Sequence, residues 1–177
     1  MDQTKTPRVK IAGFVMMAVL VLIDQLTKYW AGTTLKAASI PLIPGVFELS
    51  YVENRGAAFG ILQNANFFFL AVTLIMLAAI VGVLRKVPEE KRYTLFTLCL
   101  FGLMAGAVGN LLDRMMNGYV VDFLYFSLIN FPVFNVADIC VVCSVILLII
   151  LMVFVYRKDD DLAFLKPGPK ADGDEKK

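Results

Sequence analysis

The stretch FNVADICVVCSVILLIILMVF, residues Phe134–Phe154, contains a single charged residue, Asp138. From Ile139 to Tyr156 the chain carries no charge over 18 residues, close to the length of about 20 residues that a helix needs to cross a bilayer. An aspartate at the edge of such a span is costly to place, so it indicates a partner or a function. The stretch therefore predicts a transmembrane helix with a carboxylate at one end.

The composition of the whole chain agrees with a membrane protein. Of its 177 residues, 59% are hydrophobic and 18% are charged, and the mean hydropathy is +0.73. The net charge of +2 lies in short clusters, so no nucleic-acid partner is expected. The chain has no histidine, which excludes Ser-His and Cys-His pairs and the His-Glu-x-x-His zinc site. We expect neither a metal site nor a cofactor.

Four apolar stretches are long enough to cross a bilayer, at residues 11–30, 65–84, 94–112 and 139–156. Two long segments, 31–64 and 115–138, connect them. Within these segments, 47–53 alternates apolar and polar residues and 119–126 is rich in β-branched and aromatic residues, so each predicts a strand. We predict a membrane all-α four-helix transmembrane bundle with a small outer-face β-sheet segment and an interfacial loop.

The same pattern predicts one integral membrane domain, residues 1–158, followed by a charged, disordered cytoplasmic tail, 159–177. Basic residues cluster before the first span, between the second and third, and after the fourth, whereas 31–64 carries only Lys36 and Arg55. The positive-inside rule then places both termini in the cytoplasm and both long connections outside. The first stretch also resembles a cleaved signal peptide, but no small-x-small cleavage site follows it, so we expect it to be retained.

The conspicuous polar residues fall at one depth, near the outer interface, when each span is measured at about 1.5 Å per residue. They are Asp24, Lys28, Asn54, Arg55, Asn110, Asp113, Arg114, Asp122, Asn135 and Asp138. Asp24 and Lys28 are spaced i and i+4, so they share a helix face and can pair. Intramembrane charges usually face the bundle interior, which favours one functional cluster over separate interfacial anchors.

Asp24 has Lys28 and Asp113 has Arg114 as a possible counter-ion, whereas Asp122 and Asp138 have no basic residue within reach in the sequence. Two carboxyls that lie close together in a low dielectric cannot both ionise cheaply, so they share a proton. This is the arrangement of an aspartic protease, in which one carboxylate activates water and the protonated partner polarises the scissile carbonyl. A position at a helix N-terminus favours Asp138 as the ionised member, although Asn135 or Asp138 could also serve as the N-cap.

Five motifs in order resemble those of the lipoprotein signal peptidase (signal peptidase II) family. They are Asp24-x-x-x-Lys28, Asn54-Arg-Gly-Ala-Ala-Phe59, Gly109-Asn-Leu-Leu-Asp-Arg114, Val120-Val-Asp-Phe123 and Phe134-Asn-Val-Ala-Asp138. Each motif alone is weak, but five in sequence over most of the chain are a strong signal. Ala105 stands where we expect that family often to have glycine.

The resemblance implies a monomeric bacterial inner-membrane aspartic peptidase that contacts membrane lipids and removes signal peptides from diacylglyceryl-modified prolipoproteins, cutting before the lipidated cysteine. By matching motifs, Asp122 and Asp138 would be catalytic, with the active site at the periplasmic face. The remaining matched residues would support the substrate or hold the site together: Asn54, Arg55, Gly56, Asn110, Asp113, Arg114, Asn135, Asp24 and Lys28.

Two other functions remain open from the residues alone. Intramembrane carboxylates also serve small proton-coupled transporters, although these usually place them near the midplane on repeated helices. A scaffold could use the same charges only to pair its helices. A Ser-Lys hydrolase is disfavoured because no serine stands in a turn motif suited to a nucleophile.

Overall fold

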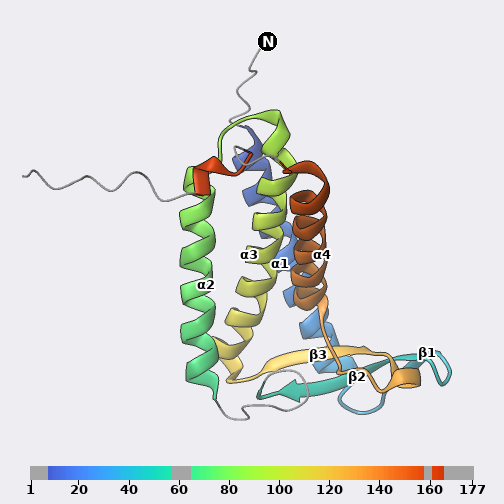
Figure 1. Cartoon of the computed structure of the whole chain (residues 1–177). Helices are drawn as coiled ribbons and strands as arrows, with labels where there is room; N and C mark the ends of the chain where they lie inside the picture. Colours follow the sequence, from blue (N-terminus) through green and yellow to red (C-terminus); the bar gives the residue numbers. More distant parts are fainter. Residues whose placement is uncertain (1–7, 57–64, 158–160, 166–177) are drawn as a thin grey trace, which may run out of the picture.

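The computed structural model describes residues 8–56, 65–157 and 161–165. Within these residues, four helices are long and apolar enough to cross a membrane. They are α1 (Arg8–Thr34), α2 (Asn66–Lys86), α3 (Thr94–Asn117, preceded by the 3-10 turn η2, Lys91–Tyr93) and α4 (Val136–Ile150, continued by the π-helical turn η4, Leu151–Val155). Figure 1 shows them as a bundle, which confirms the predicted fold class.

Two helices extend further toward the polar cluster than the apolar pattern predicts. α3 continues past residue 112 to Asn117 and ends where Gly118 takes the left-handed conformation (φ 78°), a common helix C-cap. α4 begins at Val136 rather than 139, because the side chain of Asn135 caps its first turn. Asp138 therefore lies inside the first turn of α4 and is not its N-cap.

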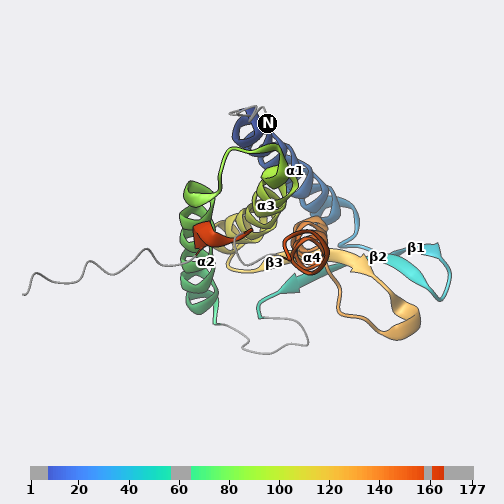
Figure 2. The same cartoon turned by 45° about the horizontal axis from the view of Figure 1, so that its top comes forward.

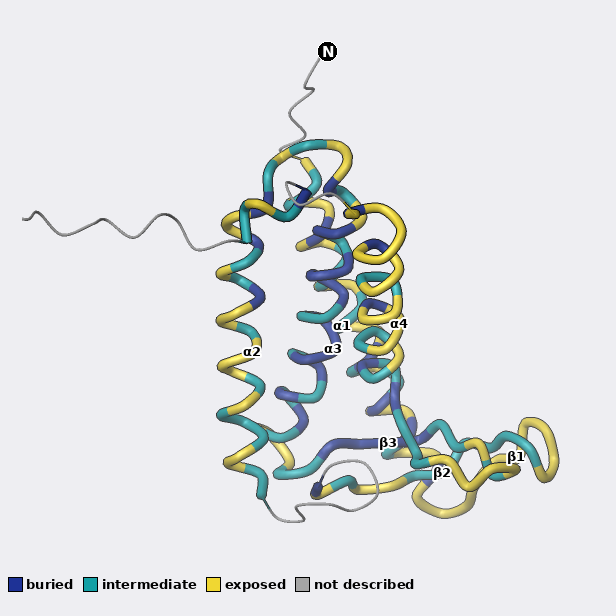
Figure 3. The backbone as a smooth tube through the Cα atoms, in the orientation of Figure 1, coloured by how far each residue is buried: buried dark blue, intermediate teal, exposed yellow. Residues whose placement is uncertain are grey.

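α3 forms the centre of the bundle. In its most apolar window 61% of the residues are buried, against 11% for α1 and for α4, and Figure 3 shows the burial along α3. Glycine permits the close approach of α4, since a Cβ at Gly106 would lie 2.3 Å from the carbonyl oxygen of Ala137. α1, α2 and α4 instead turn large apolar side chains outward, as helices in lipid do.

A three-stranded antiparallel sheet lies across one end of the bundle (Figures 1 and 2). Its order is β1 (Ile40–Ile43), β2 (Phe47–Asn54) and β3 (Val120–Tyr125). The expected strands correspond to β2 and β3, whereas β1 was not predicted. β1 is short, exposed and contains Pro41, features of an edge strand that leave no alternating pattern.

The other end of the bundle is closed by the chain after α4. Residues 161–165, which were expected to belong to a disordered tail, instead carry the 3-10 turn η5 (Ala163–Leu165) against the end of α2 (Figure 1). Arg92 donates to Asp161 Oδ1 at 2.7 Å, and the ring of Phe164 packs edge-on against Tyr93. The rest of the predicted tail, 159–160 and 166–177, lies outside the described residues.

Candidate functional site

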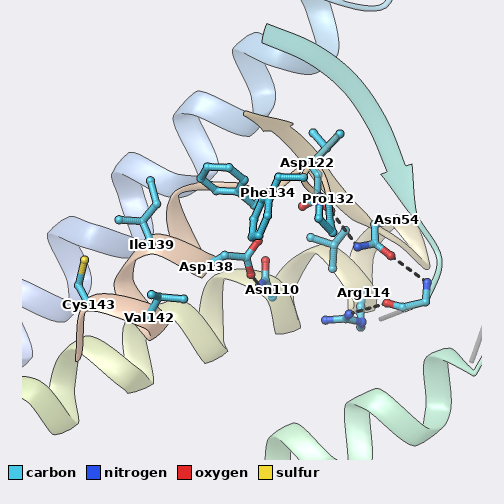
Figure 4. Close-up of a pocket in the computed structure, with 14 residues that line it drawn as sticks. Asn54, Asn110, Arg114, Asp122, Pro132, Phe134, Asp138, Ile139, Val142 and Cys143 are labelled. Atoms are coloured by element: carbon cyan, nitrogen blue, oxygen red, sulfur yellow. Dashed lines mark hydrogen bonds between the residues drawn. The ribbon is translucent and has the colours of Figure 1, made fainter. Parts of the chain in front are cut away.

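Asp122 and Asp138 face one cavity of about 500 Å³ at the sheet end of the bundle. Asp122 stands in the buried first half of β3, and Asp138 in the first turn of α4. Figure 4 shows both carboxylates at this cavity together with Asn54, Asn110 and Arg114. The fold thus brings to one place side chains that are far apart in the sequence.

Every oxygen of the two carboxylates accepts a hydrogen bond from an N–H group. Asn135 Nδ2 donates to Oδ1 of Asp122 at 2.6 Å, and Asn54 Nδ2 donates to Oδ2 at 2.8 Å. Asn110 Nδ2 donates to Oδ1 of Asp138 at 2.8 Å, and the backbone N–H of Asn135 donates to Oδ2 at 3.1 Å. When either carboxyl is protonated, the proton must therefore sit on a lone pair that does not accept one of these hydrogen bonds.

The orientation of each of these three amides is fixed by a group that can only donate. Each amide oxygen is occupied by such a donor, so its nitrogen must face a carboxylate. The donors are the backbone N–H of Gly56 to Asn54 at 3.0 Å, Nζ of Lys28 to Asn110 at 2.9 Å, and the backbone N–H of Asp138 to Asn135 at 3.0 Å. The site therefore presents N–H groups to both carboxylates.

Asn110 also links the two halves of the site. Its Oδ1 accepts a second bond from Asn135 Nδ2 at 3.1 Å. The same Asn135 nitrogen reaches Asp122, and Asn110 Nδ2 reaches Asp138. A continuous hydrogen-bonded path thus joins the two carboxylates through two amides.

Burial raises the pKa of Asp122 to about 7, and the negative charge of Asp138 adds to the rise. The amides of Asn54 and Asn135 and the positive charge of Lys28 oppose it by stabilising the ionised form. A carboxyl of this pKa is partly protonated near neutral pH, where an aspartate of ordinary pKa is ionised. Asp122 is therefore suited to donate a hydrogen bond into the cavity.

A second cluster lies behind the cavity and consists of Asp24, Gln25, Lys28 and Asp113, which we term the hub. All three N–H groups of Lys28 are used, on Asp24 Oδ2 at 2.9 Å, Asp113 Oδ2 at 3.0 Å and Asn110 Oδ1 at 2.9 Å. The predicted Asp24–Lys28 pair is present. Asp113 pairs with Lys28 of α1, whereas the sequence suggested its neighbour Arg114.

The hub holds both segments that carry the cavity carboxylates. Asp24 Oδ1 accepts the backbone N–H of Ala137, next to Asp138, at 2.8 Å. Asp113 Oδ2 accepts the backbone N–H of Val121, next to Asp122, at 3.0 Å. Each buried carboxylate of the hub thus anchors the residue directly before one carboxylate of the cavity.

The two arginines of the predicted site take different positions. Arg114 lines the cavity, with its guanidinium 4.8 Å from the ring centre of Phe69 and a 3.4 Å hydrogen bond to the carbonyl oxygen of Gly56. Arg55 bonds to Glu53 at 3.0 Å and lies over Tyr119, outside the cavity lining. Ala57, Ala58 and Phe59 of the same motif lie outside the described residues.

Sequence reasoning missed Gln25 and one wall of the cavity. Gln25 interrupts an apolar span directly after Asp24, which was the available signal. The wall follows β3 and consists of the apolar residues 131–134, and a further apolar limb runs along α4 past Ile139 and Val142 to Cys143. These side chains carry no polar pattern, so only the fold relates them to the site.

Fold and site together define a multi-span membrane protein with paired aspartates at one end of its helical bundle. Comparison with known proteins gives the family. The sequence model of the family described as signal peptidase (SPase) II matches residues 16–154 of this chain. The chain therefore belongs to the signal peptidase II family, a family of peptidases from bacteria.

Relatives and solved structures agree with this assignment. The lipoprotein signal peptidase of Symbiobacterium thermophilum is 47% identical over 149 residues, which cover 82% of this chain and 97% of the relative. That of Caldanaerobacter subterraneus subsp. tengcongensis is 46% identical over 144 residues, covering 80% and 96%. A bacterial membrane enzyme solved at 2.3 Å superposes with a TM-score of 0.73 and 33% identity, covering 90% of this chain and 97% of the other.

Proposed function

We propose that this protein is an intramembrane aspartic endopeptidase that removes the signal peptide from diacylglyceryl-modified prolipoproteins, cutting before the lipidated cysteine. The observation that carries the proposal is the pair Asp122 and Asp138 at one cavity, each held by amide or backbone N–H groups. Family membership supports the substrate class, since curated relatives are named lipoprotein signal peptidase.

The shape of the cavity supports a substrate that is part peptide and part lipid. Polar groups surround the two aspartates, whereas the limb along α4 is lined by Ile139, Val142 and Cys143. An acyl chain that leaves a bound peptide along this limb meets only apolar surface and the bilayer. The scissile peptide bond, in contrast, needs water, which the sheet end of the bundle can supply.

In the proposed mechanism, ionised Asp138 takes a proton from a water molecule while the water oxygen attacks the carbonyl carbon of the scissile bond. Protonated Asp122 gives its proton to the carbonyl oxygen, which produces a tetrahedral diol. Collapse of the diol breaks the C–N bond, Asp138 protonates the leaving nitrogen, and a diol hydroxyl returns its proton to Asp122. The products are the carboxyl terminus of the signal peptide and the free amine of the lipidated cysteine.

The residues around the dyad have separate roles in this proposal. Asn54, Asn110 and Asn135 stabilise the ionised carboxylates and hold their orientation. Arg114 and the backbone of Gly56 line the cavity and contact the peptide. Asp24, Lys28 and Asp113 hold α4 and β3 in place. Arg55 supports the end of β2 rather than the substrate.

The proposal also covers the membrane location, the orientation and the oligomeric state of the protein. Residues 1–158 form one multi-pass domain of the bacterial inner membrane, with both termini cytoplasmic and the cavity at the periplasmic face. The basic residues Arg85, Lys86 and Arg92 support this orientation, because they lie at the helix ends remote from the sheet. The protein acts as a monomer whose apolar outer surface contacts membrane lipids.

The test uses the purified full-length protein in proteoliposomes with a diacylated precursor peptide, with products read by mass spectrometry. Asp122→Asn and Asp138→Asn should each lower kcat by at least about 10³-fold while the protein still inserts. Glu48→Gln, a carboxylate-to-amide change on β2 away from the cavity, should leave the rate unchanged. Normal cleavage by both aspartate variants would refute the dyad, whereas a loss of transport in these variants instead of a loss of cleavage would favour the transporter alternative.

A further inference from the structure

Gln25 occupies a position that the proposed chemistry does not assign. Its Nε2 lies 3.0 Å from Asp113 Oδ1, 3.2 Å from Asp24 Oδ2 and 3.2 Å from the carbonyl oxygen of Gly109. All three neighbours are acceptors, so the amide nitrogen must face them; the reverse orientation would place Oε1 against two carboxylates. Gln25 therefore donates from α1 to the two carboxylates of the hub and to the backbone of α3.

The charges of the hub explain why a donor is needed there. Lys28 supplies one positive charge, while Asp24 and Asp113 bear two carboxylates, and these three side chains are almost fully buried. A buried negative charge in excess is costly unless hydrogen bonds satisfy it. Gln25 provides the donor to Asp113 Oδ1 without adding a charge.

The hydrogen bond from Gln25 to Asp113 affects Asp122 indirectly, through the contact of Asp113 with the backbone of Val121. The other oxygen of Asp113 accepts both Lys28 Nζ at 3.0 Å and the backbone N–H of Val121 at 3.0 Å. With Gln25 on Oδ1, the plane of the Asp113 carboxylate is fixed at both ends. Because Val121 directly precedes Asp122, a rotation of that carboxylate moves the strand that carries the cavity carboxylate.

We propose that Gln25 is a positioning residue for peptide cleavage, which acts through Asp113 and Val121 on the placement of Asp122. The inference rests on the proposed function, since its readout is cleavage of a lipidated precursor. A misplacement of about 1 Å in a catalytic group can lower a rate by about 10²-fold. Loss of the Gln25 donor, which displaces Asp122 only indirectly, should lower kcat by about tenfold with little change in KM.

The experiment compares three variants of the full chain in proteoliposomes. Gln25→Met keeps the size and removes the donor. Gln25→Glu places a third carboxylate beside Lys28, and it can donate only when it carries a proton. Thr27→Val is the matched control, because among the described residues Thr27 bonds only to carbonyl oxygens of its own helix, those of Ile23 and Asp24.

The expected results separate positioning from simple loss of stability. Gln25→Met should reduce kcat about tenfold, at an unchanged KM and with a folded fraction equal to that of Thr27→Val. The rate of Gln25→Glu relative to the unmodified protein should rise as the pH falls, because protonation of the new carboxyl restores a donor, whereas the ratio for Gln25→Met should stay constant. Asp24, Asp113 and Lys28, which face this position, and the cavity pair Asp122 and Asp138 are present in both proteins.

Two outcomes would overturn the inference. One is a wild-type rate for Gln25→Met. The other is a loss that follows the folded fraction alone, with no pH-dependent recovery in Gln25→Glu. If the unmodified protein itself does not cleave the lipidated precursor, the proposed function fails, and that result is distinguishable because it precedes any comparison of variants.

Discussion

The side chain of Asn135 both caps α4 and donates to Asp122: its Oδ1 accepts the backbone N–H of Asp138 at 3.0 Å, and its Nδ2 lies 2.6 Å from Asp122 Oδ1. In turn, the backbone N–H of Asn135 donates to Oδ2 of Asp138 at 3.1 Å, which completes a capping box. One fully buried amide thus starts the helix that carries one aspartate and orients the other.

The two roles of Asn135 can be separated by substitution. Asn135→Ser keeps an N-cap oxygen but removes the donor to Asp122, so stability should change little while cleavage falls by at least tenfold. Asn135→Ala removes both the N-cap oxygen and the donor, so its free energy of unfolding should be about 1 kcal/mol lower than that of Asn135→Ser. Thermal unfolding and cleavage rates of the two variants provide the measurement. Equal cleavage by Asn135→Ser and the unmodified protein would contradict a role of the amide at Asp122.

The pH dependence of cleavage should depend on Asn54. The pKa of Asp122 is raised to about 7 by burial and by Asp138, and the hydrogen bond from Asn54 opposes that rise. Since Asp122 must be protonated in the proposed mechanism, the rate should fall as the pH rises through about 7. Asn54→Leu removes a bond to the ionised form, so the alkaline limb should move to higher pH by about one unit.

The control for this shift is another asparagine outside the cavity. Asn66 donates to the backbone oxygen of Arg114 at 3.2 Å and does not line the cavity. Asn66→Leu should therefore leave the alkaline limb in place even if it lowers stability. A shift in the opposite direction for Asn54→Leu would mean that Asp122 is not the group that titrates in this limb.

The fold was largely predictable because apolar runs and alternating strands are local signals. The pairing of Asp24 with Lys28 was equally local, since both lie one turn apart on α1. The partner of Asp113 was not predictable in this way, because Lys28 belongs to another helix and only the packing of α1 on α3 brings them together. Gln25 and the apolar cavity wall at 131–134 were missed for the same reason.

Arg55 illustrates the limit of transferring a motif without geometry. It stands between Asn54 and Gly56, both of which line the cavity, yet its side chain bonds to Glu53 and lies over Tyr119. Successive residues of an extended chain point to opposite sides, so neighbours in a motif need not share a role. The sequence pointed to this segment but could not tell which of its side chains line the cavity.

The segment after α4 should contribute to stability and not to catalysis. Phe164 packs edge-on against Tyr93 and Phe96, with ring centres 5.4 and 6.0 Å apart, at the end of the bundle remote from the cavity. Phe164→Ala should lower the free energy of unfolding by about 1–2 kcal/mol through the loss of these aromatic contacts. Phe67→Ala, which truncates an exposed side chain, should change it far less. Unchanged thermal stability of Phe164→Ala would contradict the docking of this segment.

A methyl group at Gly109 should damage the site from within α3. A Cβ at this position would lie 2.5 Å from Asp24 Oδ2 and 3.2 Å from the Cβ of Ala137, so Gly109→Ala must push apart the hub and the start of α4. Such overpacking usually costs about 1–3 kcal/mol, and here it should also lower kcat, because Asp24 anchors the residue that precedes Asp138.

Gly82 in α2 is the matched control, since a Cβ there meets no atom within 4 Å. Gly82→Ala should keep full activity and gain up to about 1 kcal/mol from helix propensity. Cleavage and thermal unfolding of the two variants test this, and full activity in Gly109→Ala would show that the hub does not have to hold α4 this tightly for catalysis.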